Sequence, residues 1–109
     1  MLFRSAVRLC VSAGEALPAP LAERWRTRFG VEILDGLGST EMLHIFVSNR
    51  PGAATPGSSG VPVPGYEVRL VDGEDRDVPD GEIGSLLARG ASAAQSYHGR
   101  PAETADRGV

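Results

Sequence analysis

The residues best suited to chemistry lie in one short segment from Asp35 to Glu41, which reads DGLGSTE. Its two glycines allow the backbone to approach a bulky ligand closely. The hydroxyls of Ser39 and Thr40 can donate hydrogen bonds to phosphate oxygens, and Asp35 can accept one from an amine. Glu41 offers a hard oxygen ligand of the kind that suits Mg²⁺. These groups fit a nucleotide site without its lysine, and equally a glycine-rich turn with a solvated glutamate.

A strand, a helix and a second strand are expected to lead into this segment. Residues 7–12 and 31–34 are short and apolar, which is typical of buried strands. Between them, Pro18 and Pro20 suit a helix start, and Gly30 suits its end. One helical face carries large apolar side chains that we expect to be buried in the core: Leu21, Trp25 and Phe29.

The spacing of these elements predicts which edge would bind a ligand. A strand, a helix and a strand within about 28 residues are typical of a βαβ unit, whose two strands are parallel. The turns at residues 12–16 and 35–41 would then both follow the carboxyl ends of strands. In open α/β sheets ligands bind at that edge, so the two turns are expected to line one site.

The second half of the chain predicts a different architecture. Residues 42–47 are apolar and are expected to begin as a helical turn, and the proline- and glycine-rich residues 49–64 are interpreted as a linker. Alternating apolar and polar residues at 66–70 and an apolar run at 83–89 predict antiparallel strands. The predicted fold class is therefore α/β, with residues 1–48 forming an α/β part and residues 65–109 a β-rich subdomain that is cut short. A helix is expected to begin at residues 101–104.

Composition excludes several function classes. All 11 basic residues are arginine, so chemistry that needs a lysine ammonium cannot come from this chain. The net charge of −3 argues against non-specific nucleic-acid binding. Cys10 is the single cysteine, so we expect a small core residue rather than a disulfide, and a cytoplasmic location. No apolar run approaches the ~20 residues of a membrane span.

Several motifs together resemble the acyl-adenylate-forming superfamily of AMP-dependent synthetases and ligases. They are SAGEAL, DGLGSTEM, VPVPGYEVRLVD, DGEIGSLLARG and the run YHGRPAET, and they occur in the family's order over nearly the whole chain. TEMLHIF and SNRPG most resemble benzoate–CoA and related aryl–CoA ligases. The resemblance implies a fragment of the large N-terminal domain of an adenylate-forming enzyme.

The resemblance also implies roles for individual residues. Gly38 would line the acyl pocket, where a small residue leaves room for an aromatic ring. Thr40 would bind the ATP phosphate, Glu41 would bind Mg²⁺, and both would belong to the catalytic centre. His44 would lie near the acyl carboxylate, although a histidine on a short helix is more often a satisfied core or surface residue. The remaining matched positions would surround the adenine: Gly14, Glu15 and Ala16 on one side, Asp35 and Gly36 on the other.

The expected activity is that of an acid–thiol ligase, in fragment form. Such a ligase would activate a benzoate-like carboxylic acid with ATP and Mg²⁺ as an acyl-adenylate, and would then transfer the acyl group to CoA with release of AMP. Members of the superfamily also carry a phosphate loop with a lysine, a Thr-Gly-Asp motif and a catalytic lysine, and none occurs in these residues. We therefore expect the isolated chain not to be competent. Two alternatives stay open: an adenylation domain that loads a carrier protein, and an inactive remnant or interaction module.

Overall fold

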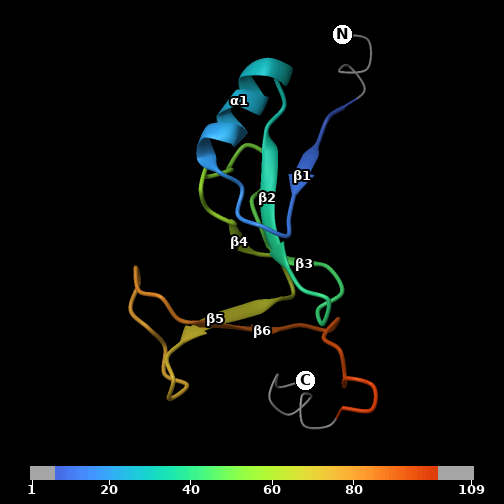
Figure 1. Ribbon diagram of the computed structural model, residues 1–109, viewed down its shortest axis with the longest axis vertical. Helices are drawn as coiled ribbons and strands as arrows, with labels where there is room; N and C mark the ends of the chain where they lie inside the picture. The colour runs from blue at the N-terminus through green and yellow to red at the C-terminus, as the bar shows by residue number, and fades with distance from the viewer. Residues whose placement is uncertain (1–6, 101–109) are drawn as a thin grey trace.

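The computed structural model describes residues 7–100 of the chain (Figure 1). A four-stranded sheet with one helix beside it occupies one end of the molecule, and a two-stranded antiparallel sheet runs across the other end. This is the mixed α/β arrangement that the sequence predicts; the helix expected at residues 101–104 lies outside the described residues. The elements are β1 (Cys10–Ser12), α1 (Ala19–Phe29), β2 (Ile33–Gly38), β3 (Ile45–Ser48), β4 (Val61–Pro62), β5 (Glu67–Val71) and β6 (Ser85–Arg89).

The predicted strand–helix–strand unit is confirmed. β1 and β2 pair in parallel, with Ser12 opposite Asp35. Helix α1 begins directly after Pro18, and Gly30 ends it in the left-handed conformation with φ 71°, where its N–H donates to the Arg26 carbonyl at 2.8 Å. Glycine adopts this conformation without the steric penalty that a Cβ brings.

The second strand is longer than predicted. Instead of ending at Leu34, β2 continues to Gly38 because β3 pairs with its second half in antiparallel fashion. The two glycines have a structural task there. A Cβ on Gly36 would lie 2.9 Å from the Ile45 side chain, and a Cβ on Gly38 would lie 2.8 Å from the His44 carbonyl oxygen. Their lack of side chains therefore lets β3 approach closely.

Residues 42–47 begin with a turn, as predicted, but no helix follows it. Met42 and Leu43 donate backbone hydrogen bonds to the carbonyls of Ser39 and Thr40, which makes a tight turn. Leu43 then adopts a positive φ of 76°, and the chain enters strand β3 two residues later. A left-handed residue cannot continue a right-handed helix, so His44 lies at the entrance to a strand.

The range interpreted as a linker takes part in the first sheet. Within residues 49–64, β4 pairs with β3, so that Val61 lies opposite Ser48.

The β5–β6 hairpin is present as predicted, but β6 begins at Ser85, and Ile83 is 98% exposed. In the connecting turn, the backbone N–H groups of Arg76 and Glu74 donate to the carboxylate of Asp72 and lower its pKa below the ordinary value.

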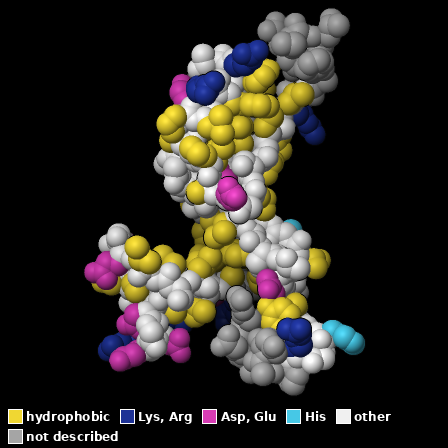
Figure 2. All heavy atoms as spheres, in the orientation of Figure 1, with side chains coloured by type: hydrophobic (Ala, Val, Ile, Leu, Met, Phe, Trp, Pro, Cys, Tyr) yellow, Lys and Arg dark blue, Asp and Glu magenta, His cyan; other side chains and the backbone are white. Residues whose placement is uncertain are grey.

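Much of the predicted apolar face of α1 is open. Trp25, expected in the core, is 37% exposed and packs against Phe29 with a ring-centroid distance of 4.4 Å and tilted ring planes. Leu9 and Val11, in the run expected to form a buried strand, are exposed, whereas Leu34 is buried and Cys10 is only half-buried. Figure 2 shows hydrophobic side chains gathered on this end of the molecule.

Among residues 7–100, no helix combines the length and apolar character that a bilayer span needs.

The main cluster of buried side chains joins the two sheets. Met42, Phe46 and Val47 are buried together, and partly buried side chains from the second sheet and its flanks pack against them: Tyr66, Val68, Ala88 and Ala93. The turn before β3 is therefore attached to both sheets.

Asn49 attaches the loop of residues 50–60 to the middle of β2. Its side chain is 5% exposed and fully used. The Nδ2 group donates to the carbonyls of Asp35 at 3.0 Å and Ser58 at 2.6 Å, and Oδ1 accepts from the Thr55 N–H at 3.0 Å. The Asn49 backbone N–H donates to the same Asp35 carbonyl at 3.0 Å. One side chain thus replaces the regular hydrogen bonds that an irregular loop lacks.

Gly60 returns this loop to the sheet through a close backbone contact. A Cβ there would lie 2.1 Å from the carbonyl carbon of Ser48 and 2.2 Å from the nitrogen of Asn49. Gly57 has a similar positive φ, 82° against 97°, but has open space around it. Alanine substitutions at these two glycines therefore allow the cost of a positive φ to be measured apart from the cost of a close backbone contact.

We expect Gly57→Ala to lower the free energy of unfolding by about 1–2 kcal/mol, the cost of a left-handed residue with a Cβ. Gly60→Ala adds overlap with backbone that cannot move aside, so its loss should reach about 4 kcal/mol or more. Urea denaturation of the two variants and the parent chain measures the difference. Equal losses at the two positions would contradict the close contact.

Replacing Asn49 with aspartate should destabilise the chain by about 3 kcal/mol or more at pH 7. The change removes both Nδ2 donors and turns a buried carboxylate toward two carbonyl oxygens. Gln95→Glu makes the same chemical change at an exposed amide and should stay within about 0.5 kcal/mol. Urea denaturation compares the variants, and a small effect at Asn49 would remove its assigned role.

Candidate functional site

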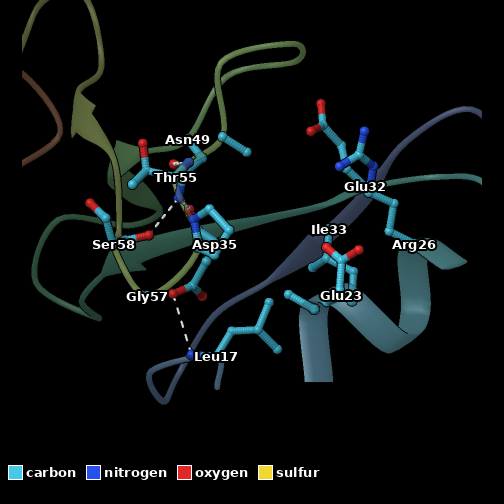
Figure 3. Close-up of a pocket in the computed structure, with 13 residues that line it drawn as sticks. Leu17, Glu23, Arg26, Glu32, Ile33, Asp35, Asn49, Thr55, Gly57 and Ser58 are labelled. Carbon is cyan, nitrogen blue, oxygen red and sulfur yellow. Dashed lines mark hydrogen bonds between the residues drawn. The ribbon is translucent and has the colours of Figure 1, made fainter. Parts of the chain in front are cut away.

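The loop after β1 lies against Asp35 in the middle of β2, whereas the sequence predicts Asp35 in a turn after the end of that strand. Leu17 donates its backbone N–H to Asp35 Oδ2 at 3.4 Å, which ties the loop to the strand (Figure 3). Gly14, Glu15 and Ala16 are exposed along an open hollow of about 520 Å³ that follows residues 12–18. Gly14 has a φ of 97°, so the loop turns sharply there. The structure thus brings this loop and Asp35 together.

Asp35 itself is buried and incompletely satisfied. Its side chain is 7% exposed, and Oδ1 has no hydrogen-bond partner among residues 7–100. A buried acceptor without a partner is unfavourable by roughly 1–3 kcal/mol. A ligand N–H, above all that of an amine, would satisfy it. Gly36, the next residue, is also buried, and it lies against Ile45 rather than in open space.

A small cavity lies beside Asp35 between α1, β2 and the loop attached by Asn49. Its volume is about 110 Å³, and Figure 3 shows Glu23 and Arg26 of α1 on one side and Thr55 and Ser58 on the other. Binding pockets for whole ligands usually measure roughly 300–1,000 Å³. The cavity therefore admits a small group at most, and a nucleotide would extend over the open hollow along residues 12–18.

The second set of predicted site residues is carried by the turn between β2 and β3. Gly38 and Thr40 are exposed, and Glu41 is half-buried. The Tyr97 hydroxyl donates to Glu41 Oε1, and the Glu41 carbonyl accepts the Ala94 N–H at 2.6 Å. Glu41 is therefore held by the segment that follows β6, far away in the sequence.

His44 ends the same turn and is also held from the second sheet. Its Nδ1 lies 2.7 Å from the Ile45 carbonyl oxygen, and its Nε2 lies 2.7 Å from the Tyr66 hydroxyl. The two rings meet edge to face, with centroids 5.3 Å apart. The Tyr66 hydroxyl also lies 2.6 Å from Ser92 Oγ, which donates to the Met42 carbonyl at 2.5 Å. His98, to which the sequence assigns no role, is exposed.

The described residues fit a magnesium ion only in company with phosphates. In this part of the chain, histidine, cysteine and carboxylate side chains form no group of three or more that could hold a metal. Glu41 supplies a single hard ligand. Mg²⁺ is commonly held by one or two carboxylates together with water and substrate phosphates, so one carboxylate on the turn is compatible with that mode.

Four residues that support the site were not singled out from the sequence: Asn49, Tyr66, Ser92 and Tyr97. Asn49 lies in the SNRPG motif, which served only for the resemblance. Tyr66 followed the alternating pattern of a strand and was interpreted as one of its residues. Their role depends on partners up to 56 positions away, and such pairings leave no local signal.

Comparison with known proteins places this geometry in a family. The chain is 53% identical over 100 residues to a benzoate–CoA ligase of Thauera aromatica. This alignment covers 91% of the chain and 19% of that protein. Two solved structures superpose with a TM-score of 0.91, each over 94% of the chain: a benzoate CoA ligase from Burkholderia xenovorans LB400 (53% identity, 22% of that structure) and the anthranilate CoA ligase AuaEII in complex with anthranoyl-AMP (55% identity, 20% of that structure).

The chain thus spans about a fifth of the length of these relatives. Residues 2–98 match the family described as AMP-binding enzyme. The match covers both sheets and both sets of candidate site residues, so the chain belongs to the AMP-binding enzyme family.

Proposed function

We propose that this chain is the part of an AMP-forming carboxylate–CoA ligase that receives ATP and an aromatic acid of the benzoate type. The observation that carries the proposal is the buried, unpartnered Oδ1 of Asp35 beside the loop of residues 13–17. That atom requires a donor, and the exocyclic amine of adenine is one. The names of the relatives, benzoate–CoA ligase and anthranilate CoA ligase, support the acid and the acceptor.

The proposed reaction has two steps. The acid's carboxylate oxygen attacks the α-phosphorus of ATP, pyrophosphate leaves, and an acyl-adenylate forms. The thiol of CoA then attacks the acyl carbon, the acyl–oxygen bond breaks, and AMP leaves with that oxygen. Charge stabilisation and positioning supply most of the catalysis in such phosphate chemistry.

The proposed binding roles fall on two parts of the structure, the loop after β1 with β2 and the turn between β2 and β3. Gly14, Glu15 and Ala16 would lie along the adenine, while Asp35 accepts its amine and Gly36 continues the strand beneath it. The hydrogen bond from the Leu17 N–H to Asp35, which joins the loop to the strand, supports this assignment.

The turn between β2 and β3 would serve the phosphates and the acid. Thr40 is exposed and can donate its hydroxyl to a phosphate oxygen. Glu41 would hold Mg²⁺, which offsets phosphate charge when it is bound. Gly38 and His44 would face the acid, with His44 near its carboxylate. Turns that follow strands at one sheet edge are the common place for such sites.

Two alternatives have distinct outcomes in one experiment. The segment of the Thauera aromatica benzoate–CoA ligase that aligns with this chain is replaced by this chain's residues, and benzoate-dependent exchange of pyrophosphate into ATP is measured. Exchange together with CoA-dependent product supports the ligase. No exchange favours an inactive remnant. The isolated 109-residue chain is expected to show none.

In this transplanted enzyme we expect the purine riboside triphosphate, which lacks the exocyclic amine of ATP, to be a poor substrate. Loss of one hydrogen bond to a buried carboxylate should raise the KM roughly tenfold or more over that for ATP. The KM for benzoate, measured with either nucleotide, is the internal control. Equal KM values for the two nucleotides would contradict the assignment of Asp35.

Glu41→Gln in the transplanted enzyme should slow acyl-adenylate formation on the order of a hundredfold at saturating ATP and Mg²⁺. The glutamine lacks the charge that holds the metal, a loss of several kcal/mol in metal-assisted sites. Glu82→Gln changes an exposed carboxylate of the β5–β6 connection and should leave the rate unchanged. A drop of less than threefold at Glu41, with an unchanged melting curve, would remove it from the site.

A further inference from the structure

Tyr66 links the second sheet to the turn that carries the candidate acid site. It directly precedes β5, whereas its hydroxyl reaches His44 just before β3 and Ser92 after β6. Through Ser92 the link continues to the carbonyl of Met42 in the same turn. Three segments that are separate in sequence therefore meet at one hydroxyl oxygen.

The ring of Tyr66 has almost no freedom to move away from this position. It is half-buried against the cluster of Met42, Phe46 and Val47. On its other side lies the backbone of Gly90, where a Cβ would come within 2.2 Å of the ring. Only glycine leaves room for the ring at that point. The packing therefore fixes where the hydroxyl lies, as a positioning group requires.

The hydrogen-bond directions follow from the number of hydrogens. Ser92 donates its one hydrogen to the Met42 carbonyl, so its oxygen accepts from the Tyr66 hydroxyl. The Tyr66 oxygen then accepts from Nε2 of His44, 2.7 Å away. Nδ1 faces the Ile45 carbonyl, which is also an acceptor. Both ring nitrogens of His44 therefore face oxygen atoms that can accept a hydrogen bond, and these two contacts fix the orientation of the ring.

We propose that Tyr66, supported by Ser92, is a positioning residue that orients the His44 ring for the carboxylate of the acid substrate. The inference rests on the proposed function in one respect, the placement of the acid's carboxylate near His44. The relay itself is a property of the described contacts. It makes the second sheet part of the acid site, although no residue of that sheet need touch the acid.

The kinetic test uses the transplanted enzyme with Tyr66→Phe, which keeps the packed ring and removes only the hydroxyl. We expect the KM for benzoate to rise about three- to tenfold, the value of one hydrogen bond, and the KM for ATP to stay within twofold. In a His44→Ala background the same change should have no further effect on the KM for benzoate. Ser96→Ala, at an exposed serine in the Ser92 segment, is the control.

Equal effects of Tyr66→Phe in the two backgrounds, or equal increases in the KM values for benzoate and ATP, would overturn the proposal. An enzyme without benzoate-dependent exchange would instead overturn the proposed function. The relay is then tested without substrate, from the ring ¹⁵N signals of the 109-residue chain. Tyr66→Phe and Ser92→Ala should each shift the signals of His44 and leave those of His98 in place. Unchanged His44 signals would show that the relay is absent.

Discussion

The carbonyl of Asp35 is the point on which the arrangement of the first sheet depends. It accepts hydrogen bonds from both the backbone and the side-chain N–H of Asn49. This happens at the position where β2 passes from its parallel partner β1 to its antiparallel partner β3. The same residue receives the loop after β1 through its carboxylate. One strand residue thereby holds two loops at once, and its remaining oxygen, Oδ1, is buried without a hydrogen-bond partner among residues 7–100.

A second constraint is the close approach of β2 and β3. The glycines of β2 let the backbone and side chains of β3 come nearer than any Cβ would allow. The pairing shifts register between Leu37 and Gly38, which marks a bulge. Bulges often lie next to functional sites because they redirect the chain. Here the redirected chain is the turn with Thr40, Glu41 and His44. The close pairing of β2 and β3 therefore also determines where this turn lies.

The two sheets act on this turn from opposite directions. β2 and β3 determine where it begins and ends, whereas hydroxyl groups flanking the second sheet hold its side chains, Tyr97 at Glu41 and Tyr66 at His44. The turn contributes Met42 to the buried cluster between the sheets. Small movements of one sheet against the other would therefore be felt at the site, since packed side chains transmit displacement rather than absorb it.

Local patterns in the sequence determined helix α1 and several strands of this protein. The proline and glycine positions around α1, the apolar run of β1 and the alternation before β5 each specify an element through the φ/ψ angles or the burial that those residues favour. Several motifs in the family's order along nearly the whole chain were sufficient for the family. What local patterns could not give was the partner of each element. β2 extends to Gly38 only because β3 is there to pair with it, and Trp25 is exposed because no described segment covers that face of α1.

The same division holds for the site. The types and order of Asp35, Thr40, Glu41 and His44 are visible in the sequence, because the chemistry of a side chain belongs to the residue itself. Their orientation is decided by the tertiary structure. Asn49, Tyr66, Ser92 and Tyr97 act across long sequence separations, and hydrogen bonds of that kind exist only after the chain has brought their donors and acceptors within about 3 Å.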